Sequence, residues 1–182
     1  PKFSGGFGLN ATFKGFDVSA FFNFMYDFDV FNANKVMMTI WASNNYNNFS
    51  MDISAAKRWR NFDDMGNEIR YSPEILAEFN KNATMWNPTS IGRPIAMSYA
   101  VEDGSFLRLN TATIGYTLPR AWTNKVGLSR VRFYASGYNL FTITGYSGYD
   151  PEVDIATGLT PNIDNNRYPR SRTYTFGVQL TF

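Results

Sequence analysis

The sequence contains no cysteine and no histidine. Without these two residue types, a zinc site loses its preferred ligands and a nucleophilic triad loses its imidazole base. No disulfide framework can support the fold either. We therefore predict that this chain is not an enzyme, and we predict no cofactor.

Long apolar runs and a strong net charge are also missing. No segment approaches the roughly 18 consecutive apolar residues of a membrane-spanning helix, so a helical membrane protein is excluded. The 17 basic and 15 acidic side chains give a formal charge of +2. That charge is too small to indicate a nucleic-acid partner held by phosphate neutralisation. We interpret the local basic cluster Lys57–Arg60 as a solvated or headgroup-facing patch.

Apolar residues are present in large number, but they alternate with polar ones. Hydrophobic residues make up 44% and aromatic residues 18% of the chain, yet its mean hydropathy is −0.30. Apolar side chains occupy odd positions between Lys2 and Lys14, and even positions from Phe16 to Val30. Successive side chains of a strand point to opposite faces, so this pattern predicts a β-hairpin with one apolar face. Its arms exceed the roughly five or six residues typical of soluble strands.

The same alternation predicts five strands, at about 2–14, 16–31, 105–118, 129–143 and 170–182. The third strand changes parity near Asn110, which predicts a β-bulge. Two stretches without alternation, 32–104 and 144–169, are interpreted as long loops. Within the first loop, Ser72–Phe79 predicts a short helix, with Ser72 at its N-cap and proline in its first turn.

Strand length, an aromatic-rich apolar face and connections that alternate between short and long together predict the fold class. A soluble β-sandwich also alternates, but it has shorter strands. We predict an all-β chain, the last strands of a transmembrane antiparallel β-barrel in the outer membrane. Such barrels have short periplasmic turns and long extracellular loops. The C-terminus should therefore be periplasmic, and the loops 32–104 and 144–169 extracellular.

The open edges of a five-stranded sheet would leave unpaired amides in lipid, so these five strands cannot stand alone. We therefore expect at least three further strands before Pro1. The chain also begins without methionine or a leader-like segment, so we interpret Pro1 as a cut within a longer protein and Phe182 as its natural end.

Several ordered motifs between positions 101 and 182 resemble the C-terminal signature of SusC/RagA-type TonB-dependent transporters of Bacteroidetes. These motifs are Val101–Leu109, Ile114–Pro119, Tyr138–Thr142, Gly148–Glu152 and Arg172–Val178. The resemblance implies a single barrel of about 22 strands, filled by a plug domain that is absent from this chain. It also implies a SusD-like surface lipoprotein as lid, and TonB, acting through the missing N-terminal part, as energy source. The implied activity is import of oligosaccharides or peptides, without a catalytic residue.

Candidate contact residues are the aromatic side chains of the two predicted loops. Their faces could stack on sugar rings or anchor a partner protein, while the alternative is packing within the loops. These residues are Trp41, Tyr46, Trp59, Trp86, Tyr146 and Tyr149.

Two further sets of residues follow from strand alternation and from the resemblance. Asp17, Asp27 and Asp29 would face the lumen, where they hydrate the interior or pair with the plug. In the last strand, the resemblance implies that Tyr174, Phe176 and Phe182 belong to a signal read by the outer-membrane insertion machinery.

The acidic residues Asp150, Glu152 and Asp154 alternate and could offer oxygen ligands to Ca²⁺. Their spacing lacks the features of an EF-hand, so we favour a turn stabilised by its own Asp-Pro geometry. Three functional alternatives remain open: a siderophore-type receptor without a lid, a surface adhesin or other β-rich binding protein, and an outer-membrane hydrolase.

Overall fold

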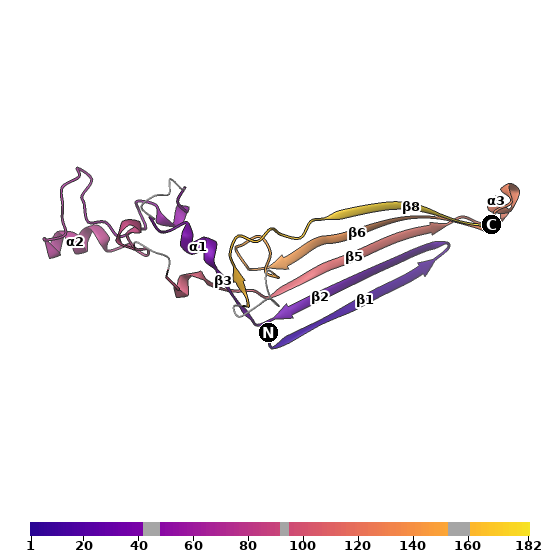
Figure 1. Cartoon of the computed structure of the whole chain (residues 1–182), viewed down its shortest axis with the longest axis horizontal. Helices are drawn as coiled ribbons and strands as arrows, with labels where there is room; N and C mark the ends of the chain where they lie inside the picture. Colours follow the sequence, from indigo (N-terminus) through magenta and orange to yellow (C-terminus); the bar gives the residue numbers. More distant parts are fainter. Residues whose placement is uncertain (42–47, 92–94, 153–160) are drawn as a thin grey trace. The chain divides into compact units, whose positions relative to one another are not determined.

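The computed structural model describes residues 1–41, 48–91, 95–152 and 161–182. Its main feature is an antiparallel five-stranded sheet in the order β1-β2-β5-β6-β8 (Figure 1). Each strand lies within the range predicted for it, except that β6 extends to Thr144. The strands are β1 (Phe3–Phe13), β2 (Phe16–Tyr26), β5 (Phe106–Thr117), β6 (Arg130–Thr144) and β8 (Thr173–Thr181).

The strand register gathers the apolar side chains on one face of this sheet. Directly paired residues share a face, and one such row runs Val18, Ile114, Ala135 and Phe176 across four strands. Other rows on this face contain aromatic pairs. The rings of Phe7 and Phe22 stack with centroids 4.9 Å apart, and Phe16 lies 4.5 Å from Tyr116.

This apolar face is exposed. Phe176 is 79% exposed and Phe3 is 64% exposed. Leaving an apolar area of this extent in water is unfavourable. Such an area marks a surface that contacts protein or lipid. The opposite face carries mainly Ser, Thr, Asn and charged side chains.

The predicted bulge is confirmed at Asn110. Along β2, Phe21 pairs with Thr111 and the next residue, Phe22, pairs with Leu109, so Asn110 is left without a partner. The register of β5 with β6 shifts at the same place. The extra residue returns Leu107 and Leu109 to the apolar face, which is how a bulge repairs alternation.

The second predicted strand, 16–31, is wrong in its extent. β2 ends at Tyr26, and Asp27 then adopts a left-handed backbone with φ of 60°. Phe28 and Val30 continue the apolar alternation because they are buried with Phe106 and Tyr146 in a small core, and not because the barrel strand continues.

The residues that follow Asp27 belong to other elements. β3 (Asp29–Asn32) joins β4 (Val101–Asp103) and β7 (Ile163–Asp164) in a separate three-stranded sheet, in the order β4-β3-β7. The chain forms two compact units. The first comprises residues 1–30, 102–163 and 167–182, and the second comprises 31–101 and 164–166.

The second unit, here called the loop unit, has a core of its own. Its centre is formed by Val36, Ile40 and Ala100. Its elements are α1 (Ala33–Met37), η1 (Met51–Ile53), α2 (Pro73–Asn80), η2 (Pro88–Ser90) and η3 (Ser98–Ala100). The range predicted as a long loop therefore contains a folded body, and α2 is the helix expected there. Ser72 occupies its N-cap, but the Ser72 side chain makes no capping hydrogen bond.

The short connection between β5 and β6 contains a helical turn around Trp122. It consists of α3 (Arg120–Thr123) followed by η4 (Asn124–Val126). Within the described ranges, no helix is long and apolar enough to cross a membrane.

Candidate functional site

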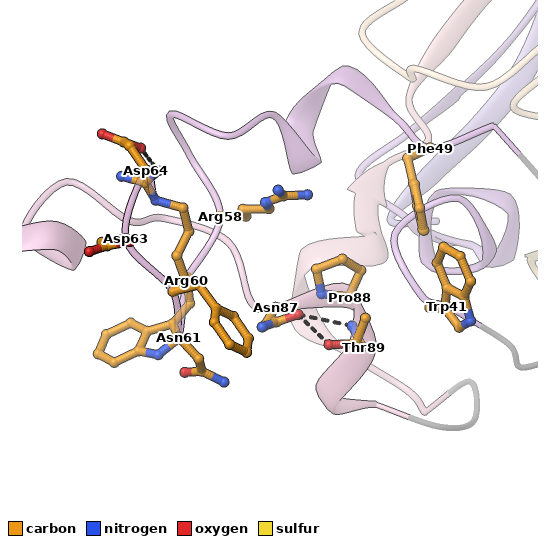
Figure 2. Close-up of a pocket in the computed structure, with 12 residues that line it drawn as sticks. Trp41, Phe49, Arg58, Arg60, Asn61, Asp63, Asp64, Asn87, Pro88 and Thr89 are labelled. Atoms are coloured by element: carbon orange, nitrogen blue, oxygen red, sulfur yellow. Dashed lines mark hydrogen bonds and ion pairs between the residues drawn. The ribbon is translucent and has the colours of Figure 1, made fainter. Parts of the chain in front are cut away.

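The loop unit contains a pocket of about 490 Å³ (Figure 2). This volume falls in the range of about 300–1,000 Å³ that is usual for sites of small ligands. Aromatic, cationic, amide and hydroxyl side chains all contribute to its lining. The lining residues are Trp41, Phe49, Arg58, Trp59, Arg60, Asn61, Phe62, Asp63, Asp64, Asn87, Pro88 and Thr89.

One wall of the pocket is an aromatic pair next to η2. The backbone N–H of Trp41 donates to the carbonyl of Pro88 at 2.9 Å. The indole of Trp41 lies against Phe49, with ring centroids 5.9 Å apart. Asn87 caps η2 by accepting hydrogen bonds from the backbone N–H and the hydroxyl of Thr89, at 3.0 and 2.7 Å. These local bonds fix the aromatic pair beside a polar edge.

The facing segment, Arg58–Asn61, is held by contacts from distant parts of the chain. The backbone N–H of Trp59 donates to the carbonyl of Met85 at 2.8 Å. The buried amide of Asn80, at the end of α2, accepts from the N–H of Arg60 at 2.7 Å and donates to its carbonyl at 2.9 Å. This two-way clamp fixes the backbone that carries Trp59.

A tight hairpin closes the pocket beyond Arg60. Phe62 and Glu68 form an antiparallel bridge, and Gly66 takes a φ of 86° that only glycine adopts readily. The carboxylate of Asp63 accepts hydrogen bonds from the backbone and side chain of Asn67 and from the N–H of Met65. These donors, led by the Asn67 side chain, lower the pKa of Asp63 below its usual value.

Both acidic side chains of the pocket interact with neighbouring residues of the chain. Asp63 is used within its hairpin, and Asp64 pairs with the guanidinium of Arg60 at 2.6 Å. Arg60 also lies over the ring of Phe79, at 5.3 Å from its centroid. The half-buried guanidinium of Arg58 makes no ion pair with any residue that the structure describes. Among the described residues, the pocket therefore combines an arginine that makes no ion pair with exposed aromatic faces.

The structure brings together two of the six predicted contact residues. Trp41 and Trp59 both line the pocket and are 47% and 41% exposed. Trp86 lies outside the pocket lining: its indole N–H donates to the carbonyl of Thr39, and its ring stands edge-on to Tyr99. Trp86 thus supports the fold of the loop unit, as the packing alternative expects.

The other three predicted contact residues have different environments. Tyr146 is only 6% exposed, so its assignment as an exposed contact residue is wrong: it fills the core around Phe28 and Val30. Tyr149 is 79% exposed on the other unit. Tyr46 lies outside the described residues.

Several lining residues were missed from the sequence. Phe49 and Phe62 carry no spacing signal in a segment without periodicity, and Arg58 was interpreted as part of a headgroup-facing patch. The sequence does not show which of Arg58 and Arg60 has an acidic partner. In the structure, Asp64 pairs with Arg60.

The three predicted lumen residues do not share one environment. Asp17, on β2, pairs with Arg132 of β6 across the intervening strand. A Cβ on Gly115 would lie 2.6 Å from the Asp17 carboxylate, so a larger residue there would force the Asp17 and Arg132 side chains to shift. Asp27 lies in the bend after β2 and Asp29 lies in β3, so barrel alternation no longer supports a lumen position for either.

Two of the three acidic residues considered for Ca²⁺, Asp150 and Glu152, belong to a buried ion-pair cluster. Arg108 pairs with Asp150 and lies 3.4 Å from Glu152, which also pairs with Arg170. Burial alone would raise the pKa of Asp150, but hydrogen bonds from Arg108 and the Glu152 backbone bring it below its usual value. Within the described ranges, no group of acidic side chains could hold a metal ion; Asp154 lies outside them.

Comparison with known proteins finds related receptors. No family model matches the chain. The chain is 31% identical, over its whole length, to TonB-dependent receptor P3 of Formosa agariphila. It is 32% identical, over 82% of its length, to TonB-dependent receptor SusC of Bacteroides thetaiotaomicron.

Solved structures agree with these relatives. The chain superposes on the RagAB peptide transporter with a TM-score of 0.72, at 25% identity over 98% of its length. A RagAB peptide importer in a closed-closed state gives a TM-score of 0.71 at the same identity and coverage. The chain spans only about 16% of the length of the P3 receptor and 17% of the RagAB chain.

Proposed function

The chain belongs to the SusC/RagA-type TonB-dependent receptors of the outer membrane, and we propose that it forms wall strands and external loops of an energy-coupled nutrient importer. Its fold is that of the outer-membrane β-barrel of these receptors. The proposed cargo is an oligosaccharide or a peptide, and the proposed partners are a SusD-like lipoprotein lid and TonB. The rest of the barrel and its plug would complete the pore.

The observation that carries this proposal is the register of the five-stranded sheet. Apolar rows such as Val18, Ile114, Ala135 and Phe176 would contact lipid, and the Ser-, Thr- and Asn-rich face would line a wet lumen. Burying such a face in lipid gains about 25 cal/mol for each Å² removed from water. The outer edges of β1 and β8 would pair with other strands of the barrel, since unpaired edges are costly in lipid.

We propose an orientation with the turns at Lys14 and at α3 in the periplasm. The first turn is very short, with positive φ at both Lys14 and Gly15, whereas the connections from β2 to β5 and from β6 to β8 are long. Outer-membrane barrels place short turns on the periplasmic side. The loop unit and its pocket would then be extracellular, where they help to recognise cargo or the lid.

Uptake by living cells tests the proposed import. A deletion strain would be compared with its complemented parent for uptake of a panel of glycans, peptides and iron-siderophores, with and without TonB. We expect loss of uptake of at least one glycan or peptide, and the same loss without TonB. Loss of siderophore uptake alone, or unchanged uptake of the whole panel, would contradict the proposal.

Co-purification tests the proposed lid. We expect a surface lipoprotein to accompany the full receptor when it is extracted from membranes in mild detergent. A receptor consistently recovered alone would instead indicate a lid-free transporter. Recovery of the folded protein in the aqueous phase without detergent would indicate an adhesin or a soluble binding protein.

A further inference from the structure

The strongest unexplained feature of the loop unit is the pocket around Arg58. Trp86, Tyr146 and the buried charges at Arg108 all have structural roles, but the free guanidinium of Arg58 has none among the described residues. Arg58 is half-buried, lines the pocket with two tryptophans and has no ion-pair partner among the described residues, so it is a candidate to bind an anion from outside.

We propose that this pocket binds an acidic oligosaccharide, meaning one that carries a carboxylate or sulfate group on its sugar rings. Arg58 pairs with the oxyanion, and the indole rings of Trp41 and Trp59 contact the apolar faces of neighbouring sugars. This inference rests on the proposed function, because it names the cargo class that the extracellular loops select.

The pairing of the charged side chains in the pocket leaves Arg58 as the group that would meet an anionic ligand. Asp64 is neutralised by Arg60, and Asp63 is occupied by the backbone and side chain of Asn67. Asp63 stays ionised, but neither carboxylate forms an ion pair with Arg58 among the described residues, so its guanidinium can still donate hydrogen bonds to a ligand. In Figure 2, Arg58 lies between the Trp41–Phe49 pair and Arg60. Guanidinium groups bind carboxylate and sulfate through two parallel hydrogen bonds, which fixes orientation as well as charge.

The remaining lining residues favour a sugar over a peptide. Exposed faces of Trp41 and Trp59 offer flat apolar surfaces, and Phe62, which is 49% exposed, adds a third. Asn61, Asn87 and Thr89 supply amide and hydroxyl groups at the edges of these surfaces. Hydroxyl-rich rings with apolar faces match this alternation of stacking surfaces and small polar groups. The described lining contains no free strand edge that would pair with a peptide backbone.

Binding to the full receptor, purified with any lid that accompanies it, tests the proposal. Calorimetry would compare an oligogalacturonide with its carboxyl-reduced form, and a sulfated carrageenan oligosaccharide with its desulfated form. We expect at least one acidic probe to bind about tenfold or more tightly than its neutral counterpart, as one charge-assisted contact provides. The two pairs of probes distinguish carboxylate from sulfate.

Two variants assign this preference to Arg58. Arg58→Gln should reduce affinity for the acidic probe about tenfold and leave affinity for the neutral probe unchanged. Arg58→Lys keeps the charge without the planar fork and should lose part of the affinity. The control is Arg70→Gln, which removes an arginine of the same unit that pairs with Glu68 and lies outside the pocket lining.

Several results would overturn the proposal. These are equal affinity for charged and neutral probes, no binding of either acidic probe, an unchanged Arg58→Gln variant, and an equal loss in Arg70→Gln. Binding of an acidic peptide through Arg58, with no binding of the sugars, would overturn the choice of cargo. If acidic sugars bind through Arg58 but cells fail to take them up, the proposed import fails and the binding site stands.

Discussion

The buried ion-pair cluster around Arg108 yields the sharpest test of how the long loop after β6 is attached to the barrel strands. Arg108, on β5, is 2% exposed, and its partner Asp150 is 5% exposed. Replacing Arg108 by methionine keeps an apolar stem of similar length but leaves Asp150 and Glu152 without their shared cation. The change therefore removes one charge and leaves Asp150 without an ion-pair partner, while Glu152 keeps Arg170.

The expected cost follows from the remaining contacts. Breaking a buried pair from one side typically costs about 3–5 kcal/mol. Asp150 would keep one good donor, the N–H of Glu152 at 2.9 Å, so we expect the lower end, about 3 kcal/mol. Removing both charges, as in Arg108→Met with Asp150→Leu, should cost less than Arg108→Met alone, because no unpaired Asp150 carboxylate remains.

Protease cleavage of the β6–β8 connection measures this cost in the full receptor, held in outer-membrane vesicles. When opening is faster than cleavage, the cleavage rate follows the population of the open form. A loss of about 3 kcal/mol corresponds to roughly 100-fold faster cleavage. The control is Lys81→Met, whose exposed ion pair with Glu78 lies in the loop unit. A change below about threefold, or a double variant cleaved faster than Arg108→Met, would refute the reasoning.

Further predictions concern pH, the sheet, the pocket and assembly. Because the folded pKa of Asp150 is lowered, its contribution is complete above its unfolded value of about 3.9 and is lost as pH falls through the folded pKa; cleavage of the same connection should stay slow at neutral pH and accelerate only in acid. Gly115→Ala should separate Asp17 from Arg132 and cost about 1 kcal/mol, measured as an earlier loss of heat-modifiable migration; an unchanged transition would count against a role for this ion pair. Asn80→Ala removes the clamp on Arg60 and should destabilise the loop unit by about 2–3 kcal/mol, seen as faster hydrogen exchange there, while exchange in the barrel strands stays the same. Phe182→Ser should lower the amount of folded barrel more than uptake per barrel; equal amounts of folded protein would contradict the proposed assembly signal.

The sheet could be predicted from the sequence because each strand has one continuous apolar face. The bulge at Asn110 was visible for the same reason, since an extra residue must reverse the parity of Leu107 and Ile114. The end of the second strand could not be predicted, because Phe28 and Val30 keep the alternation while packing into a different core.

The pocket was harder to predict than the sheet. Its two tryptophans were found by residue type alone, but their positions depend on hydrogen bonds between segments far apart in sequence, such as Arg60 with Asn80 and Trp59 with Met85. Short-range sequence patterns do not indicate hydrogen bonds between such distant segments. That Arg58 makes no ion pair among the described residues likewise depends on the partners of Arg60, Asp63 and Asp64.

Spin-label accessibility along β8 tests the central claim, that one face of this sheet contacts lipid in the outer membrane. Single cysteines would replace successive residues from Thr173 to Gln179, in a background without other cysteines, and each would carry a nitroxide. The account predicts that labels at Tyr174, Phe176 and Val178 collide with oxygen dissolved in lipid, and that labels at the alternate positions collide with a water-soluble nickel complex. Equal accessibility to both reagents along the strand, or access to nickel at Phe176, would contradict it.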